Sequence, residues 1–263
     1  MDCSLTLLGA GLASVMAGCC DKPYVTDERL DRGLVLVLTG IEGRSRLNRA
    51  IREGLADGAV DRAIEIVDWT VAGYLTSPYN LRAERRNRAK AAEIAARIER
   101  YAAAHPGRGV TLVGHSGGTA MAAFVAESLG PGVQVDGIVM LASALSPRYR
   151  LDEALARSRR GIVNYTSKYD WWFLGVGTFV FGTSDGRHGQ AAGRVGFQSP
   201  TEGGAYDKLY QVAWHAGMLR KRHLGGHLTS SAAPYVAAYV APVINRKTWD
   251  AEFITNVTRP GGG

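Results

Sequence analysis

The chain has 263 residues, of which 46% are hydrophobic and 21% are charged, and its formal net charge is +7. This length suits one sizeable domain with a buried core, and the composition excludes a largely disordered protein. The positive charges are spread along the chain and no nucleic-acid-binding motif accompanies them. We therefore expect no nucleic-acid partner.

The N-terminal segment predicts export from the cell. It is uncharged from Cys3 to Cys20 and ends in small residues, as the apolar core of a secretion signal does. The run VMAGC resembles the lipoprotein box of bacterial lipoproteins. This resemblance implies a signal peptide over residues 1–18, a lipid on Cys19, a tether over residues 19–32 and a protein anchored to an envelope membrane. The segment departs from the pattern at its head, which holds Asp2 and no Lys or Arg. Simple secretion (including a periplasmic protein) and an apolar helix packed on the domain remain alternatives.

The body of the chain contains no cysteine, because Cys3, Cys19 and Cys20 are the three that the sequence holds. A disulfide framework, a thiolate metal site and cysteine catalysis are excluded there. His223 and His227 do not form a metal-binding pair on a helix, because Gly225 and Gly226 interrupt it. We expect neither a metal nor a cofactor.

From residue 33 onward, short apolar runs alternate with amphipathic stretches. We expect strands in GLVLVLTG, AIEIVDW, GVTLVGHS, VDGIVMLASAL and GIVNYTS, with a last strand in KLYQVAWHAGMLR. We expect helices in SRLNRAIREGLADG, with Ser45 as its cap, over residues 81–104, and in GGTAMAAFVAESLG, LDEALARS and SSAAPYVAAYVAPVI. This alternation predicts one α/β domain over residues 33–245, with a mainly parallel sheet covered by helices on both faces. Residues 171–205 form an insertion without a clear period, and residues 246–263 form a C-terminal tail.

The segment GHSGG places Ser116 between a predicted strand and a predicted helix. The pattern G-x-S-x-G is weak evidence by itself, but this context is the one that a nucleophile elbow requires. A serine at such a corner has a strained backbone and projects from the carboxyl edge of the sheet, where open α/β sheets bind ligands. We therefore predict that Ser116 is a nucleophile.

A serine nucleophile needs a base and a carboxylate that orients the base. Asp170 follows the fifth predicted strand directly, and His227 precedes the final predicted helix in a glycine-rich loop. We predict that Asp170 is the acid and His227 the base, with His223 as the alternative base. His115 is expected to pack beneath the serine.

The oxyanion of a tetrahedral intermediate needs two backbone donors. The amide of Gly117, directly after the nucleophile, is the first. The loop after the first strand supplies the second, for which Ile41 is the first choice and Gly40 the alternative.

The segments GHSGG, KYDWW and GGHL, in this order, resemble those of the α/β-hydrolase superfamily over about residues 33–245. The resemblance implies a serine esterase or lipase-like enzyme acting on a small-molecule or lipid-like ester. The chain departs from typical members by the long interval between Asp170 and His227. The surplus is expected to form a lid or a pocket wall that presents Trp171, Trp172 and Phe173 to the substrate, or an insertion that packs its own aromatic residues.

The leading interpretation is a serine hydrolase that cleaves a carboxylic ester or a related acyl bond through a Ser-His-Asp triad. Two alternatives remain: acyl transfer on the same triad, and a non-catalytic envelope binding protein on a hydrolase scaffold.

Overall fold

The computed structural model describes residues 23–71, 76–170, 185, 189–200 and 204–259. The predicted signal peptide, Cys19 and the three predicted pocket aromatics Trp171, Trp172 and Phe173 lie outside these residues, so those assignments stay predictions. Within the described ranges, no helix is both long enough and apolar enough to cross a membrane.

Six strands form one sheet in the order β2-β1-β3-β4-β5-β6, and every neighbouring pair is parallel. This confirms the predicted α/β architecture. All six strands occur where the sequence predicted them: β1 (Leu34–Leu38), β2 (Ala63–Val67), β3 (Val110–His115), β4 (Gly137–Leu141), β5 (Ile162–Thr166) and β6 (Leu209–Ala213).

Alternation along the strands divides the interior into two apolar layers. Leu36 and Leu38 of β1 face one layer, whereas Val35 and Val37 of the same strand face the other. Both faces of the sheet are therefore buried, which explains why β1 is apolar throughout instead of alternating with polar residues.

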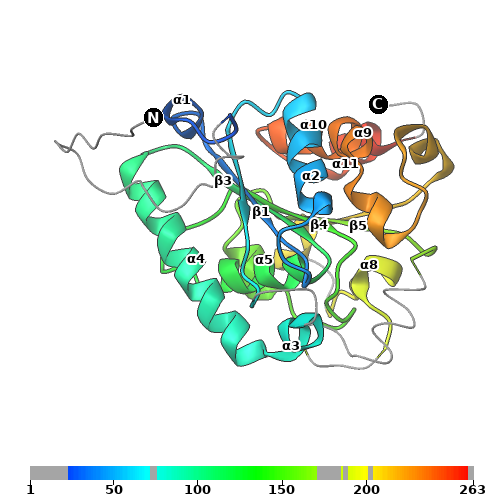
Figure 1. Cartoon of the computed structure of the whole chain (residues 1–263), viewed down its shortest axis with the longest axis horizontal. Coiled ribbons are helices and arrows are strands. Elements are labelled where there is room, and N and C mark those ends of the chain that lie inside the picture. Colours follow the sequence, from blue (N-terminus) through cyan, green and yellow to red (C-terminus); the bar gives the residue numbers. More distant parts are fainter. Residues whose placement is uncertain (1–22, 72–75, 171–184, 186–188, 201–203, 260–263) are drawn as a thin grey trace, which may run out of the picture.

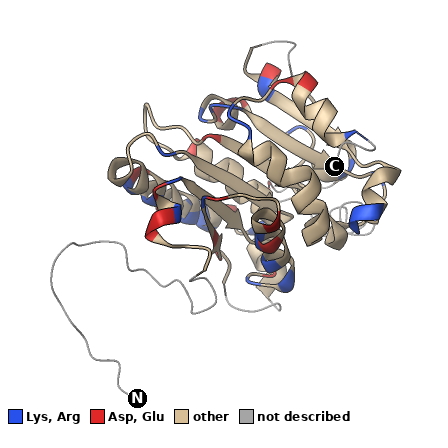
Figure 2. Ribbon diagram, turned by 90° about the horizontal axis from the view of Figure 1, so that it is seen from above, with Lys and Arg blue, Asp and Glu red and all other residues tan. Residues whose placement is uncertain are grey.

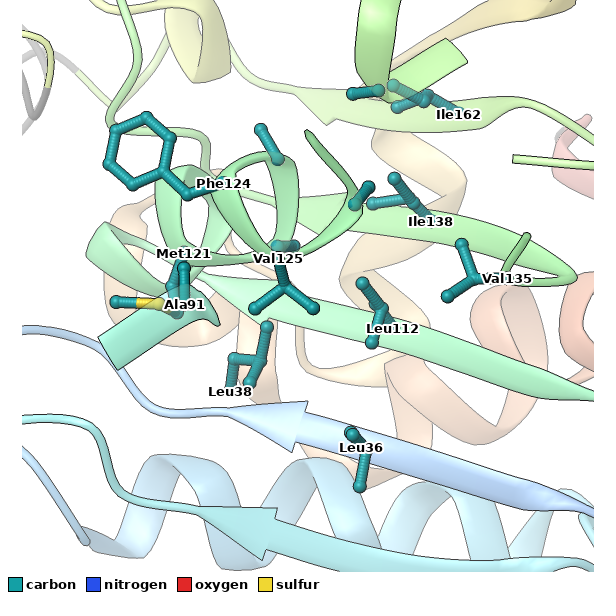
Figure 3. Packing of buried hydrophobic residues seen from close by; sticks show 14 of the residues in the cluster. Leu36, Leu38, Ala91, Leu112, Met121, Phe124, Val125, Val135, Ile138 and Ile162 are labelled. Atoms are coloured by element: carbon teal, nitrogen blue, oxygen red, sulfur yellow. The ribbon is translucent and has the colours of Figure 1, made fainter. Parts of the chain in front are cut away.

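The first layer lies under α4 (Glu84–Ala104), α5 (Gly117–Glu127) and α6 (Asp152–Ala156). Figure 3 shows Met121, Phe124 and Val125 of α5 packed over Leu112 and Ile138 of the sheet. The helix is buried along almost its whole length, which accounts for its run of small and apolar residues.

The second layer lies under α2 (Arg46–Asp57) and the C-terminal helices on the opposite face (Figure 1). Ser45 caps α2, as predicted, and its hydroxyl accepts a hydrogen bond from the Leu47 amide.

The C-terminal helical segments are α9 (Ala233–Tyr235), the π-helical η6 (Val236–Val240), α10 (Ala241–Asn245) and α11 (Ala251–Thr258). The shorter remaining elements are α1 (Asp27–Leu30), α3 (Ser77–Arg82), α8 (Ala192–Val195), and the 3₁₀ segments η3 (Gly204–Lys208), η4 (Ala216–Lys221) and η5 (His227–Ser231).

Three helical regions differ from the prediction. The long helix begins at Glu84 rather than at residue 81, because Ala83 has a non-helical ψ of 58° between α3 and α4. The predicted last helix over residues 230–244 is divided. Its π segment directly precedes α10, whose Pro242 has no amide to donate to the preceding turn. Helix α11 lies in the segment that was assigned to the tail.

Charged residues are almost absent from the sheet, where Glu65 is the single charged side chain in the six strands. Figure 2 shows basic and acidic residues interspersed over the helices and loops around it.

Candidate active site

Ser116 occupies a strained corner between β3 and α5. Its φ is 55° and its ψ is −124°, a conformation that residues with a side chain rarely adopt. Its amide donates a hydrogen bond of 3.0 Å to the carbonyl of Leu141, the last residue of β4. The serine is thus held at the carboxyl edge of the sheet by a neighbouring strand, and its side chain is only partly buried.

The glycines around the serine are required by close backbone contacts. A Cβ at Gly118 would collide with the carbonyl of Leu38 and would lie 2.5 Å from that of Thr39, both at the end of β1. A Cβ at Gly114 would lie 2.5 Å from the carbonyl of Gly118 itself. The first and last glycines of the motif therefore let strand and helix approach closely enough to form the corner.

His227 and Asp170 form a buried pair. Nδ1 of His227 lies 2.7 Å from Oδ2 of Asp170, and both side chains are almost completely excluded from solvent. In this geometry Nδ1–H donates to the carboxylate, so Nε2 is left as the basic nitrogen. The two residues are 57 positions apart in the sequence and follow different strands.

The loops that carry this pair are bonded to each other. Ser167 donates its hydroxyl hydrogen to the carbonyl of Gly225 at 2.6 Å. Gly225 has a φ of +86°, and a Cβ there would lie 3.1 Å from the Cβ of Tyr169. A glycine at this position therefore allows the loop containing His227 to lie directly against the loop containing Asp170.

His115 connects the elbow to the histidine loop. Its side chain is buried, as expected, and its Nε2 lies 3.3 Å from the backbone carbonyl of His227. The two imidazole rings have centroids 5.1 Å apart. Burial, followed by the neighbouring charge of His227, lowers the pKa of His115 to about 3, so it is neutral and Nε2–H donates to the carbonyl. This contact brings His227 to the side of the elbow.

The two predicted oxyanion donors are neighbours. A Cβ built on Gly117 would lie 3.4 Å from the amide nitrogen of Ile41 and 2.5 Å from its Cγ2. Neither amide donates a hydrogen bond to another described residue. The Trp69 indole, whose Nε1–H donates to the Thr39 carbonyl at 2.7 Å, lies beside them. A Cβ at Gly40, the alternative donor, would collide with the Glu42 carboxylate.

Two other histidines, His223 and His215, make contacts that stabilise the fold and lie outside the candidate triad. His223 contacts Thr229 Oγ1 at 3.2 Å and packs on the Tyr235 ring, with centroids 4.4 Å apart. Burial lowers its pKa to about 4. His215 accepts from the Gly217 amide and donates to the Thr258 carbonyl of α11. In the described part of the chain neither is paired with a carboxylate.

The described part of the insertion lies against the loop after β4. The amides of Ala192 and Gly193 donate to the carbonyls of Leu145 and Ser143 at 2.8 and 2.9 Å. Asp185 accepts from the Ser146 amide and hydroxyl. Residues 171–184 lie outside the described residues, so the lid and pocket-wall interpretation stays a prediction.

Sequence reasoning did not identify two supporting residues. Thr119 donates to the Ser116 carbonyl at 2.6 Å and accepts from the Ala144 amide, which ties the elbow to the loop after β4. Asn80 donates to the Ile41 carbonyl at 3.0 Å. Neither belongs to a recognisable motif. Ala144 and Ile41, which they hold, are 25 and 39 positions away in sequence, and no pattern in one sequence indicates such contacts.

An open groove of about 600 Å³ lies over α4, α5 and α6, and none of the candidate catalytic residues lines it. Several of its charged side chains bond to one another. Arg88 pairs with Glu127 at 3.0 Å, and Tyr149 donates to the same carboxylate at 2.6 Å. The groove is therefore lined by a network of surface charges, and it is separate from Ser116.

Comparison with known proteins finds similarity to solved structures and none to family models or curated sequences. No family model and no curated protein sequence matches the chain. Among solved structures, Aspergillus fumigatus lipase B is 10% identical, with a TM-score of 0.51 over 89% of this chain. This chain spans 59% of the length of that lipase. A cutinase-like protein from Cryptococcus sp. is 17% identical (TM-score 0.40, 83% of this chain and 97% of that one), and RedJ, with a PEG molecule bound in its active site, is 14% identical (TM-score 0.34, 60% and 75%). The lipase comparison indicates a shared fold.

Proposed function

We propose that this chain, which has the α/β-hydrolase fold, is a serine hydrolase that cleaves a carboxylic ester or a related acyl bond. The observation that carries the proposal is the buried contact of 2.7 Å between His227 and Asp170, held beside the strained elbow of Ser116. A buried histidine whose Nδ1 is bound to a carboxylate is suited to accept a proton from a serine through its second ring nitrogen.

In the proposed reaction, Oγ of Ser116 attacks the acyl carbon while Nε2 of His227 accepts the hydroxyl proton. Asp170 remains ionised, keeps the imidazole in the correct tautomer and stabilises the imidazolium that forms. The carbonyl electrons move to oxygen, and the amides of Gly117 and Ile41 donate to that oxyanion. The oxyanion then collapses, the leaving group takes the proton from His227, and an acyl-enzyme remains.

Water completes the cycle by the same steps in reverse order. It loses a proton to His227 and attacks the acyl carbon, and Ser116 leaves with the proton returned to its oxygen. The likeness in fold to a lipase supports an ester as the substrate class. Trp171, Trp172 and Phe173 remain candidates for contacts with the acyl group.

A fluorophosphonate probe tests the proposal directly, because it labels an activated serine covalently. We expect the wild-type protein to be labelled, Ser116→Ala to take no label, and His227→Ala to react about 10⁴-fold more slowly or worse. His223→Gln is the matched control, because His223 is also a buried histidine of the same loop but is not bonded to Asp170. It should be labelled at close to the wild-type rate. A folded wild-type protein that takes no label would overturn the proposal in favour of a non-catalytic scaffold.

We also propose that the protein is exported and carries a lipid on Cys19, which would hold it at an envelope membrane. The run VMAGC and the uncharged segment before it support this proposal. A Cys19→Ser variant, expressed in bacteria fed labelled fatty acid, should lose the label and leave the membrane fraction. Unlabelled wild-type protein would contradict the lipid.

A further inference from the structure

Asn80 is a fully buried polar residue on α3, in the crossing between β2 and α4. Its Nδ2 donates to the carbonyl of Ile41 at 3.0 Å, across 39 positions of sequence. A buried amide side chain is costly unless it is hydrogen-bonded, so a residue of this kind indicates a specific task. Its main partner is the residue whose amide faces Gly117.

We propose that Asn80 is a positioning residue that holds the amide of Ile41 in place as the second oxyanion donor. The inference rests on the proposed function, since an oxyanion forms only if Ser116 attacks an acyl group. Asn80 itself does not touch the substrate. It acts through the peptide of Ile41.

The peptides on either side of Ile41 are both restrained. The carbonyl of Gly40, which shares a peptide plane with the Ile41 amide, accepts from the Gly43 amide at 3.1 Å. In a trans peptide the N–H points away from the C=O. Because the Gly40 carbonyl points toward the Gly43 amide, the Ile41 N–H points away from this turn. The carbonyl of Ile41 is held by Asn80 on its other side. Removal of Asn80 takes away the hydrogen bond that holds the Ile41 carbonyl and leaves the turn as the hydrogen-bonded restraint on this stretch of backbone.

Asn80 is itself fixed in orientation. Its Oδ1 accepts from the Val71 amide at 2.9 Å, which obliges Nδ2 to be the group that faces Ile41. Its backbone carbonyl accepts from Nδ2 of Asn87 at 2.7 Å, and Asn87 is a buried residue of α4. The position of the oxyanion loop is therefore set by α4 through two asparagines.

The expected decrease in kcat follows from the contribution of one oxyanion donor to transition-state stabilisation. Removing one oxyanion donor from a serine hydrolase costs about 10²–10³-fold in kcat. Loss of Asn80 displaces the Ile41 donor without deleting it, so we expect kcat to fall by about 10–100-fold. The hydrogen bond from this donor is weaker to the carbonyl of the bound substrate than to the oxyanion. KM should therefore change by less than about 3-fold.

The experiment compares Asn80→Ala and Asn80→Asp with wild type on matched oxo and thiono esters. Asn80→Asp keeps the volume and the acceptor for the Val71 amide, but presents a carboxylate to the Ile41 carbonyl. Active-site titration with the fluorophosphonate counts competent sites, so that kcat is expressed per site and misfolded protein is not counted. Asn164→Ala is the matched control, because Asn164 is equally buried and bonds to the Ala192 carbonyl of α8 instead.

We expect both Asn80 variants to lose kcat per site and to lose preference for the oxo ester over the thiono ester by a similar factor. Sulfur interacts weakly with amide donors, so that preference reports the oxyanion donors and not general stability. Asn164→Ala should retain both quantities within about 3-fold. Asn80 variants with unchanged kcat per site and unchanged oxo preference would overturn the inference. An unlabelled wild-type protein would instead overturn the proposed function, and the inference with it.

Discussion

Two buried histidines near the candidate site, His115 and His223, are kept neutral by their surroundings. Burial lowers the pKa of His115 to about 3 and that of His223 to about 4, against an ordinary value of 6.5. Neither has a carboxylate partner among the described residues, so no negative charge offsets the desolvation of the charged form. In the unfolded chain both imidazoles would take up protons below about pH 6.5.

This difference predicts an acid-sensitive fold. Between about pH 4 and 6.5 the unfolded chain binds more protons than the folded chain at these two positions, so the free energy of unfolding must decrease as the pH falls. Each histidine contributes up to about 1.4 kcal/mol per pH unit in that range and nothing above it. Urea denaturation at pH 7, 6 and 5 measures the slope. His223→Gln should make it shallower by one proton, and an unchanged slope would show that His223 is not responsible.

At the scale of secondary structure, the strands were predictable because each is a continuous apolar run. Both faces of the sheet are buried, so β1 and β4 contain nothing but apolar residues and glycine, which sequence patterns reveal directly. Helix α2 was also predictable, because Ser45 forms a capping box with Asn48 at its start.

The errors in the helices have local causes that depend on distant partners. The chain breaks at Ala83, and the backbone carbonyl of Asn80 in the preceding turn accepts from the side chain of Asn87 in α4. Helix α11 has a clear cap in Asp250, whose carboxylate accepts from the Phe253 amide at 2.7 Å. It was still missed, because it is short and lies beyond the last predicted helix, in the segment assigned to the tail. Ile254 and Thr258 are its buried residues, and His215 bonds to the carbonyl of Thr258.

At the scale of the whole molecule, Arg160 joins the C-terminal segment to the sheet. Its buried guanidinium donates to Thr111 Oγ1 of β3 at 3.0 Å, to the Asp136 carbonyl at 3.1 Å and to the Ile244 carbonyl at 3.1 Å. It also lies over the Trp249 ring, 4.6 Å from the centroid. Burial lowers the pKa of Arg160 to about 10, which still leaves it charged at neutral pH. These contacts are at the amino end of the strands, opposite Ser116.

Arg160→Met should therefore destabilise the protein without altering the chemistry. Loss of the guanidinium removes the donor to the Ile244 carbonyl and to Thr111 Oγ1 and leaves Asp136 without a buried cation, and we expect the free energy of unfolding to fall by about 3–5 kcal/mol. Arg159→Met is the matched control, because the neighbouring Arg159 is exposed and bonds to Asp136 at the surface. It should cost less than about 1 kcal/mol. Urea denaturation measures both. An equal loss in the two variants, or slower fluorophosphonate labelling of folded Arg160→Met, would contradict this assignment.

The sequence by itself determined the parallel sheet and the chemical types at its carboxyl edge. Apolar runs alternating with helices specify that fold because both faces must be covered. The order of Ser116, Asp170 and His227 suggested their roles, because Ser116 and Asp170 each follow a predicted strand directly and His227 precedes the final predicted helix. Only the tertiary structure decided that His227 meets Asp170, that the Ile41 amide faces Gly117, and that Asn80 supports it. Those contacts join residues that are at least 39 positions apart, and their geometry depends on how loops pack against one another. A strand pattern fixes which edge a loop occupies, but hydrogen bonds among several loops fix where its atoms lie.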